Sequence, residues 1–159
     1  MKISTLFFCI SLWLFHTSAI AQDSVFLEEL TWTEVRDLIE SGTSRVLIPT
    51  AGTEQNGPHM VLGKHRYIIE RTADLIAREL DQTLVAPVMT HVPEGNIDPP
   101  TSHMRFPGTI SLPNEHFVKV LEYTARSMAA HGFTDILFIS DSGINMRVIA
   151  EVTESLINE

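Results

Sequence analysis

The sequence predicts an α/β domain in three layers, with a mostly parallel sheet covered by helices on both faces. Three apolar runs with the composition of buried strands occur at 45–50, 83–89 and 135–140. Segments with helical periodicity separate these runs, and such an alternation is typical of parallel sheets that are buried on both faces. The chain has 159 residues, of which 44% are hydrophobic, and this suits one globular domain with a core.

The individual helices are predicted from their end signals and their apolar spacing. Thr31 and Glu34 have the spacing of a capping box, and Gly42 can end the helix that they begin. Asn114 is a candidate cap for a later helix, which His131 and Gly132 can end. Further helices are expected where apolar residues recur at helical spacing, at 66–80, 115–130 and near 145–158.

The first residues differ in composition from the rest of the chain. Lys2 precedes an apolar stretch at 6–15, and Ala19-Ile20-Ala21 has the small-x-small pattern of a signal cleavage site. A membrane anchor is the alternative, but the stretch is short for crossing a bilayer. We therefore expect a signal peptide at 1–21, a domain at 22–159, and a periplasmic or secreted protein.

Composition argues against several classes of function. Cys9 is the only cysteine and lies in the predicted signal, so the mature protein is expected to have no thiol nucleophile, cysteine ligand or disulfide. Export without disulfides is more typical of a bacterial periplasm than of a small disulfide-stabilised domain. The net charge of −9 argues against nucleic acid or anionic lipid as a partner.

Polar residues gather in the connections that follow the three predicted strands. In parallel sheets, ligands bind beyond the carboxyl ends of the strands. One set of side chains is therefore expected at a single edge of the sheet: Glu54, His59, His91, Glu94, Asp141 and Ser142. Carboxylates and imidazoles suit Zn²⁺ or Mn²⁺, ions that support hydrolysis at neutral pH. Each residue also has a simpler interpretation at the surface, and Asp141 can cap the last helix.

Three ordered motifs resemble the creatininase (creatinine amidohydrolase) family. GTEQNGPH at 52–59 resembles the family's Gly-Ser/Thr-x-Glu-Gln-His-Gly-Pro-His, and HMRFPGT at 103–109 resembles its His-x-x-Phe-Pro-Gly-Thr. The third motif of the family is His-Gly-Phe, then a strand, then Asn-Gly-His-Gly-Gly-Asn. It resembles the segment at 131–145, where HGF is followed by a predicted strand and by DSGIN. The resemblance covers about residues 27–158. It implies a hydrolase of amide or lactam C–N bonds with one or two Zn²⁺ or Mn²⁺ ions.

The ligand positions of the family carry over unevenly. Its first ligand Glu matches Glu54, but its ligand His falls on Asn56 and its bridging Asp falls on His65. The His of its third motif falls on Ser142, directly after Asp141. Two interpretations remain. In one, the site is rewritten, and Glu54, His65 and Asp141 hold the metal. In the other, the site has decayed, and the chain is a non-catalytic scaffold or binding protein. We favour the first, because decay would not favour new ligand-competent residues at these positions.

The resemblance implies further roles and leaves the substrate open. His59 is expected to be catalytic, either beside the ligands or at the substrate carbonyl, and His103 and Ser142 are expected to bind a small amide or lactam substrate. Family members continue past the position of Glu159 with a further strand and a His/Glu motif. Residues 22–159 are thus expected to be the amino-terminal part of the family domain. The ring-like oligomers of family members suggest a homo-oligomer.

Overall fold

A parallel sheet of three strands forms the centre of the molecule in the computed structural model, which describes residues 24–158. The strands are β1 (Arg45–Thr50), β2 (Thr83–Val85) and β3 (Asp135–Ser140), in the order β2-β1-β3. This arrangement confirms the predicted α/β class. The predicted signal peptide at 1–21 lies outside the described residues.

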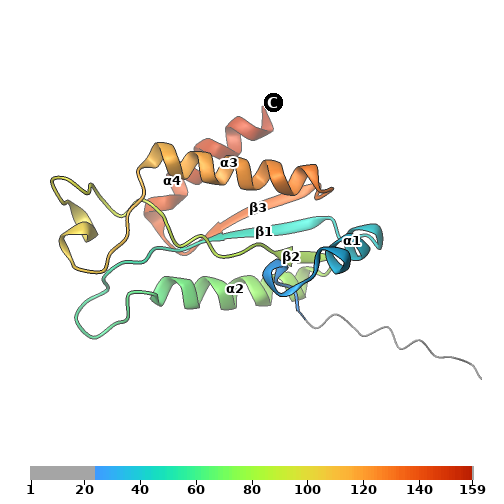
Figure 1. Ribbon diagram of the computed structural model, residues 1–159, viewed down its shortest axis with the longest axis horizontal. Helices are drawn as coiled ribbons and strands as arrows, with labels where there is room; N and C mark the ends of the chain where they lie inside the picture. The colour runs from blue at the N-terminus through green and yellow to red at the C-terminus, as the bar shows by residue number, and fades with distance from the viewer. Residues whose placement is uncertain (1–23, 159) are drawn as a thin grey trace, which may run out of the picture.

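Helices cover both faces of this sheet. In Figure 1, α2 lies on one side of the strands, and α3 and α4 lie on the other. The bounds of the four helices are Trp32–Glu40 for α1, Lys64–Leu80 for α2, Asn114–Ala130 for α3 and Gly143–Ile157 for α4. Two short 3₁₀ helices, η1 (Leu27–Glu29) and η2 (Ser102–Arg105), lie in the connections. None of the described helices has the length and apolar character needed to cross a membrane.

Two hydrophobic cores fix the central strand between the helical layers. Successive side chains of a strand point to opposite faces, so β1 supplies both cores. Leu47 packs with Ala73 and Ala77 of α2, whereas Ile48 packs with Ala125 of α3 on the other face. Burying an aliphatic side chain of this size contributes about 1.5–3 kcal/mol. The carboxyl end of β1 is therefore a rigid starting point for the connection that follows it.

The register of the strands places their carboxyl ends side by side, so the connections that follow them begin at the same edge of the sheet. Thr50, at the end of β1, lies opposite Ser140 at the end of β3. On its other side Thr50 forms an isolated parallel bridge with Met89. The connections after β1 and β2 project together at one end of the molecule, at the left of Figure 1. Side chains that are distant in sequence thus share this edge.

Several predicted details are confirmed at the level of individual residues. The Thr31 backbone N–H donates to Glu34 Oε2 at 2.7 Å, and the Glu34 N–H donates to Thr31 Oγ1 at 3.4 Å, which completes the capping box. Gly132 follows the cap residue His131 with φ of 105°, a conformation that favours glycine. The bounds of β1 and β3 are those predicted.

Other boundaries were predicted incorrectly. β2 ends at Val85 rather than at 89: the Ala86 N–H still donates to the Leu47 carbonyl, but the next bond to β1 comes from the Met89 N–H to the Pro49 carbonyl, one residue out of the alternating register. Helices α2 and α4 begin two residues earlier than expected, at Lys64 and Gly143. The cap residue of α3 is Pro113, so the side chain of Asn114 does not cap that helix.

Candidate metal centre at the carboxyl edge of the sheet

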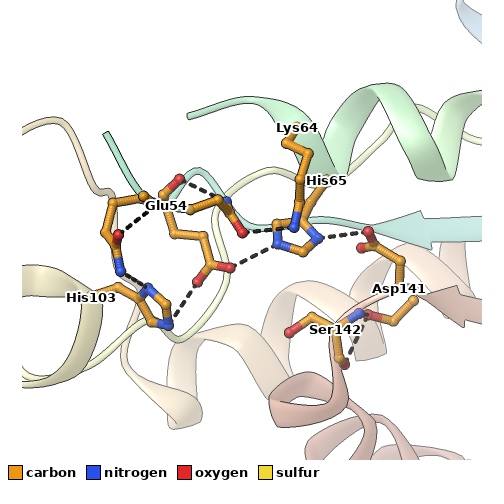
Figure 2. Close-up of polar contacts among 10 residues, drawn as sticks. Glu54, Lys64, His65, His103, Asp141 and Ser142 are labelled. Atoms are coloured by element: carbon orange, nitrogen blue, oxygen red, sulfur yellow. Dashed lines mark hydrogen bonds and ion pairs between the residues drawn. The ribbon is translucent and has the colours of Figure 1, made fainter. Parts of the chain in front are cut away.

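Glu54 is the centre of a buried polar cluster beyond the end of β1. Its Oε1 lies 2.8 Å from His65 Nε2, and its Oε2 lies 3.3 Å from His103 Nε2. Figure 2 shows the carboxylate between the two imidazoles. Glu54 is only 6% exposed, so one buried carboxylate joins two rings, one from the start of α2 and one from η2 in the connection after β2.

The chain after β1 is folded back on itself and holds Glu54 in place. The Glu54 N–H donates to the Leu62 carbonyl at 3.3 Å, and the Asn56 side chain donates to the Glu54 carbonyl at 3.2 Å. Lys64 Nζ in turn donates to Asn56 Oδ1 at 2.7 Å. Asn56 therefore holds the loop together, at a position where the resemblance implies a ligand histidine.

His65 lies in the first turn of α2 and uses both of its ring nitrogens. Nε2 faces Glu54, and Nδ1 lies 2.6 Å from Asp141 Oδ2. Asp141 directly follows β3, so its carboxylate reaches this ring across the end of the sheet. Asp141 does not cap α4, because the cap residue is Ser142 and its side chain forms no capping bond. The Ser142 N–H instead donates to Ser140 Oγ at 3.2 Å.

His103 lies on η2 and is held by a second contact. Its Nδ1 lies 3.3 Å from Gln55 Nε2, while Gln55 Oε1 accepts from the Gly57 N–H at 2.9 Å. Because Gly57 fixes the oxygen of the amide, the NH₂ group of Gln55 faces the ring. The backbone N–H of His103 also donates to the backbone carbonyl of Glu94 at 3.2 Å, which ties η2 to the segment that carries Glu94.

Glu94 is the most deeply buried carboxyl group of the edge. It is 2% exposed, and neither of its side-chain oxygens has a hydrogen-bond partner among the described residues. A Cβ added at Gly52 would lie 2.0 Å from Glu94 Oε1, so the carboxyl group rests directly against the backbone of the first connection. Its own backbone is fixed, because the Glu94 N–H donates to Ser111 Oγ at 3.0 Å.

The position of Glu94 changes its acidity. Burial, followed by the neighbouring Glu54 carboxyl group, raises the pKa of Glu94 to about 9. In the metal-free protein Glu94 is therefore neutral at pH 7. The same group becomes charged when a cation takes the place of its proton. The ligand atoms of Glu54, Glu94 and His103 all lie within 4.8 Å of one another.

The structure brings together most of the residues that were predicted for the site. Glu54, His65 and Asp141 form one chain of contacts, and His103 joins it through Glu54. Their roles as ligands or substrate-binding groups stay predictions, as does the role of Ser142. Glu94 was expected at this edge but not as a ligand, and only its place after the second strand could have indicated it.

Two predicted histidines lie at the surface. His59 and His91 are both exposed, and His59 lies beside Gly57 in the turn of the first connection. Both rings are accessible to solvent. The catalytic role of His59 stays a prediction.

A parallel α/β domain with buried carboxylates and imidazoles at its carboxyl edge defines the chain as a protein with a site suited to a divalent cation. Comparison with known sequences supplies the family. Residues 28–159 match the sequence profile described as creatininase, creatinine amidohydrolase, and the chain belongs to this family.

Curated relatives share the sequence at low identity. The chain is 26% identical over 138 residues to creatinine amidohydrolase of Pseudomonas putida, and the match covers 86% of this chain and 52% of that protein. It is 22% identical over 119 residues to 3-dehydro-scyllo-inosose hydrolase of Thermotoga maritima, covering 75% of this chain and 36% of that protein. The chain thus spans about half the length of these relatives or less.

Solved structures share the fold. A crystal structure of creatinine amidohydrolase (creatininase) superposes with a TM-score of 0.75 at 24% identity, covering 86% of this chain and 52% of that one. Further neighbours are a manganese form of creatininase and an E122Q mutant described as Zn-Zn type, with TM-scores of 0.74 and 0.75. Each covers 85% of this chain and 52% of its own. These likenesses establish the three-layer parallel arrangement.

Proposed function

We propose that this protein is a metal-dependent hydrolase that cleaves a C–N bond of a small amide or lactam. The observation that carries the proposal is the buried carboxylate of Glu54, which has an imidazole at each of its two oxygens. Membership of the creatininase family supports the reaction class. The names of the curated relatives, an amidohydrolase and an inosose hydrolase, are consistent with hydrolysis of small molecules.

The residues present fit a divalent ion. The cluster consists of carboxylate oxygens and imidazole nitrogens, which are ligands that Zn²⁺ and Mn²⁺ accept. Two of its carboxyl groups, those of Glu54 and Glu94, are buried, and buried carboxylates are normally paired or coordinate a metal. Glu54 would hold the ion together with a neighbouring imidazole. A bound ion of this kind lowers the pKa of water and polarises a carbonyl group.

The protein's own residues supply orientation. Glu54 is fixed by the folded connection after β1, and His65 is fixed between Glu54 and Asp141. Exposed His59 lies on the same connection and is the candidate to contact the substrate carbonyl. A non-catalytic scaffold has no specific observation in its favour, whereas the burial of two neighbouring carboxyl groups, those of Glu54 and Glu94, costs free energy that a bound cation offsets.

The proposal includes an exported protein, because the predicted signal peptide at 1–21 precedes the domain. It also includes a homo-oligomer. Both follow from the sequence and its resemblance, and the substrate within the class of amides and lactams stays open.

The test combines metal content with hydrolysis. Purified protein is stripped with a chelator, reloaded with Zn²⁺ or Mn²⁺, and assayed on creatinine, other lactams and linear amides. Hydrolysis is expected only in the reloaded protein, and Glu54→Gln is expected to abolish it. Hydrolysis that survives both the chelator and Glu54→Gln would contradict the proposal, as would the absence of hydrolysis in every metal-loaded form.

A further inference from the structure

The ligands of the cation can be assigned more closely, on the premise of the proposed function that the site holds a divalent ion. We propose that Glu54, Glu94 and His103 form the cation site. The ion then lies on the His103 side of Glu54, and His65 and Asp141 are not its ligands. This assignment differs from the ligand set predicted from the sequence and from the positions that the family resemblance implies.

Glu54, Glu94 and His103 bring three ligand atoms close together. One atom each of Glu54, Glu94 and His103 can be chosen so that all lie within 4.8 Å of one another. Among residues 24–158, this is the one group of three His, Asp or Glu side chains that meets this condition. The three residues come from two connections, and the backbone hydrogen bond from His103 to the Glu94 carbonyl holds two of them together.

Buried Glu94 has no ion-pair partner among the described residues, and the ionisable neighbour that acts on it is another carboxyl group, that of Glu54. Both carboxyl oxygens of Glu94 are buried and lack a hydrogen-bond partner among the described residues. Such a group costs free energy unless it is paired, by about 1–3 kcal/mol or more. Other buried groups of the cluster, such as His65, have partners within the protein. A cation beside Glu94 offsets the cost and explains why a carboxylate occupies this position.

The chain leaves space for the Glu94 side chain by placing glycines beside it. The Glu94 carboxyl group occupies the place that a side chain at residue 52 would fill, since a Cβ there would lie 2.0 Å from Oε1. Gly95, directly after Glu94, has φ of 122°, and a Cβ there would lie 2.3 Å from the Thr101 carbonyl oxygen. Two glycines therefore allow the backbone to direct Glu94 against the first connection.

On the other side of Glu54, the ring of His65 is held between two carboxylates. Both nitrogens of His65 contact carboxylates, at 2.8 Å for Glu54 and 2.6 Å for Asp141, whereas only one nitrogen of His103 does, at 3.3 Å from Glu54. Figure 2 shows the ring standing between the two carboxylates, which keeps them apart. Asp141 Oδ1 is also buried without a partner, but no group of three close ligands among the described residues includes it. Asp141 is accordingly a positioning residue for the ring of His65.

The experiment compares two matched substitutions of a carboxylate by an amide, Glu94→Gln and Asp141→Asn. Chelator-stripped protein is titrated with Zn²⁺ alone, and separately with Mn²⁺ alone, in competition with a chromophoric chelator. Glu94→Gln is expected to weaken binding by about 100-fold or more, beyond the usual effect of groups that only orient ligands. Asp141→Asn is expected to weaken binding by no more than about 10-fold. His103→Gln is a second ligand variant and should resemble Glu94→Gln.

The outcomes separate this assignment from the proposed hydrolase. Unchanged affinity in Glu94→Gln, or a larger loss in Asp141→Asn than in Glu94→Gln, would overturn the assignment even if the protein hydrolyses amides. No binding of either metal by the unsubstituted protein would overturn both proposals. A metal-loaded protein without turnover, in which Glu94→Gln abolishes binding, would support the site and contradict the hydrolase. Circular dichroism of each variant shows that the fold is retained, which Glu94→Gln favours because it removes no volume.

Discussion

His65 and Asp141 are joined by a contact of 2.6 Å between Nδ1 and Oδ2, although 76 positions separate them in the chain. The contact links the first turn of α2 to the end of β3 and presses the other ring nitrogen against Glu54. A hydrogen bond to an ionised carboxylate is shorter and stronger than a neutral one. This ring therefore contributes to stability as well as to the arrangement of the site.

Removing the His65 ring is expected to lower the stability of the metal-free protein. His65→Ala leaves Glu54 and Asp141 without the donor between them, which should lower the free energy of unfolding by about 1–3 kcal/mol. His59→Ala changes an exposed histidine of the same region and should stay within about 0.5 kcal/mol. Urea denaturation at neutral pH measures both. Equal losses in the two variants would show that the contact adds no stability.

A side chain at position 52 is expected to displace Glu94. Gly52→Ala forces the carboxyl group away from its place, which should weaken Zn²⁺ binding at least about 10-fold and destabilise the protein by about 1–3 kcal/mol. Gly143→Ala is the control, because an added Cβ at that glycine meets no atom within 4 Å. Combining Gly52→Ala with Glu94→Ala removes the clash, so the stability losses should not add. If the stability losses of the two substitutions add, the side chain at position 52 does not clash with Glu94.

Stability without metal is expected to depend on pH through Glu94. Burial and the nearby Glu54 raise the pKa of Glu94 to about 9, from a usual value of 4.5. Between these values the folded state keeps a proton that the unfolded state has lost, so the free energy of unfolding falls as pH rises from about 5 to about 9. The thermal midpoint of the chelator-stripped protein should therefore fall as the pH rises through this range, and it should fall more than that of the Glu94→Gln variant. If the thermal midpoints of the two proteins change with pH in the same way, the raised pKa of Glu94 is contradicted.

Changing Gln55 to glutamate is expected to strengthen ion binding. The Gln55 amide group faces His103 Nδ1 as a donor, which leaves the ring proton on Nε2, toward Glu54. A ligand nitrogen must be free of its proton, and an acceptor at position 55 favours that tautomer. Gln55→Glu should raise Zn²⁺ affinity by about 10-fold. Gln82→Glu adds the same charge at an exposed position before β2, at the other end of the sheet. An equal gain in Zn²⁺ affinity there would show that only the overall charge matters.

Export predicts a defined mature terminus. If the signal at 1–21 is removed after Ala21, protein purified from the periplasmic or extracellular fraction of its host should begin at Gln22. Amino-terminal sequencing or intact mass measures this. A chain that retains Met1 and is found in the cytoplasm would contradict the prediction.

The arrangement of the elements could be predicted because it depends on local signals. The apolar run at 45–50 and the Thr31 capping box are complete within a few residues, and both occur where expected. The helix of His65 was also found, although its start was placed two residues late. That error matters, because the earlier start places His65 in the first turn, where it faces both Glu54 and Asp141.

The ligands of the second connection could not be predicted in the same way. The path of a long segment rich in proline and glycine is fixed by tertiary contacts, such as those of Glu94 with Ser111 and His103. Whether a carboxylate is buried without a partner depends on what lies against it, here the bare backbone of Gly52. The sequence shows a glutamate and a glycine 42 positions apart and gives no sign that they touch.

The strand that delivers Asp141 has a neighbour on one side only among residues 24–158. β3 pairs with β1 along its whole length, and the outward-facing half of its amide groups has no strand to bind. Leu137 on this strand is 41% exposed. Amide hydrogen exchange should therefore be uneven across the sheet, slow in β1 and fast at alternate positions of β3. A strand that pairs with this edge of β3 would slow the exchange of these amides. Because Asp141 directly follows β3, such a strand would also restrict the movement of the carboxylate that orients His65.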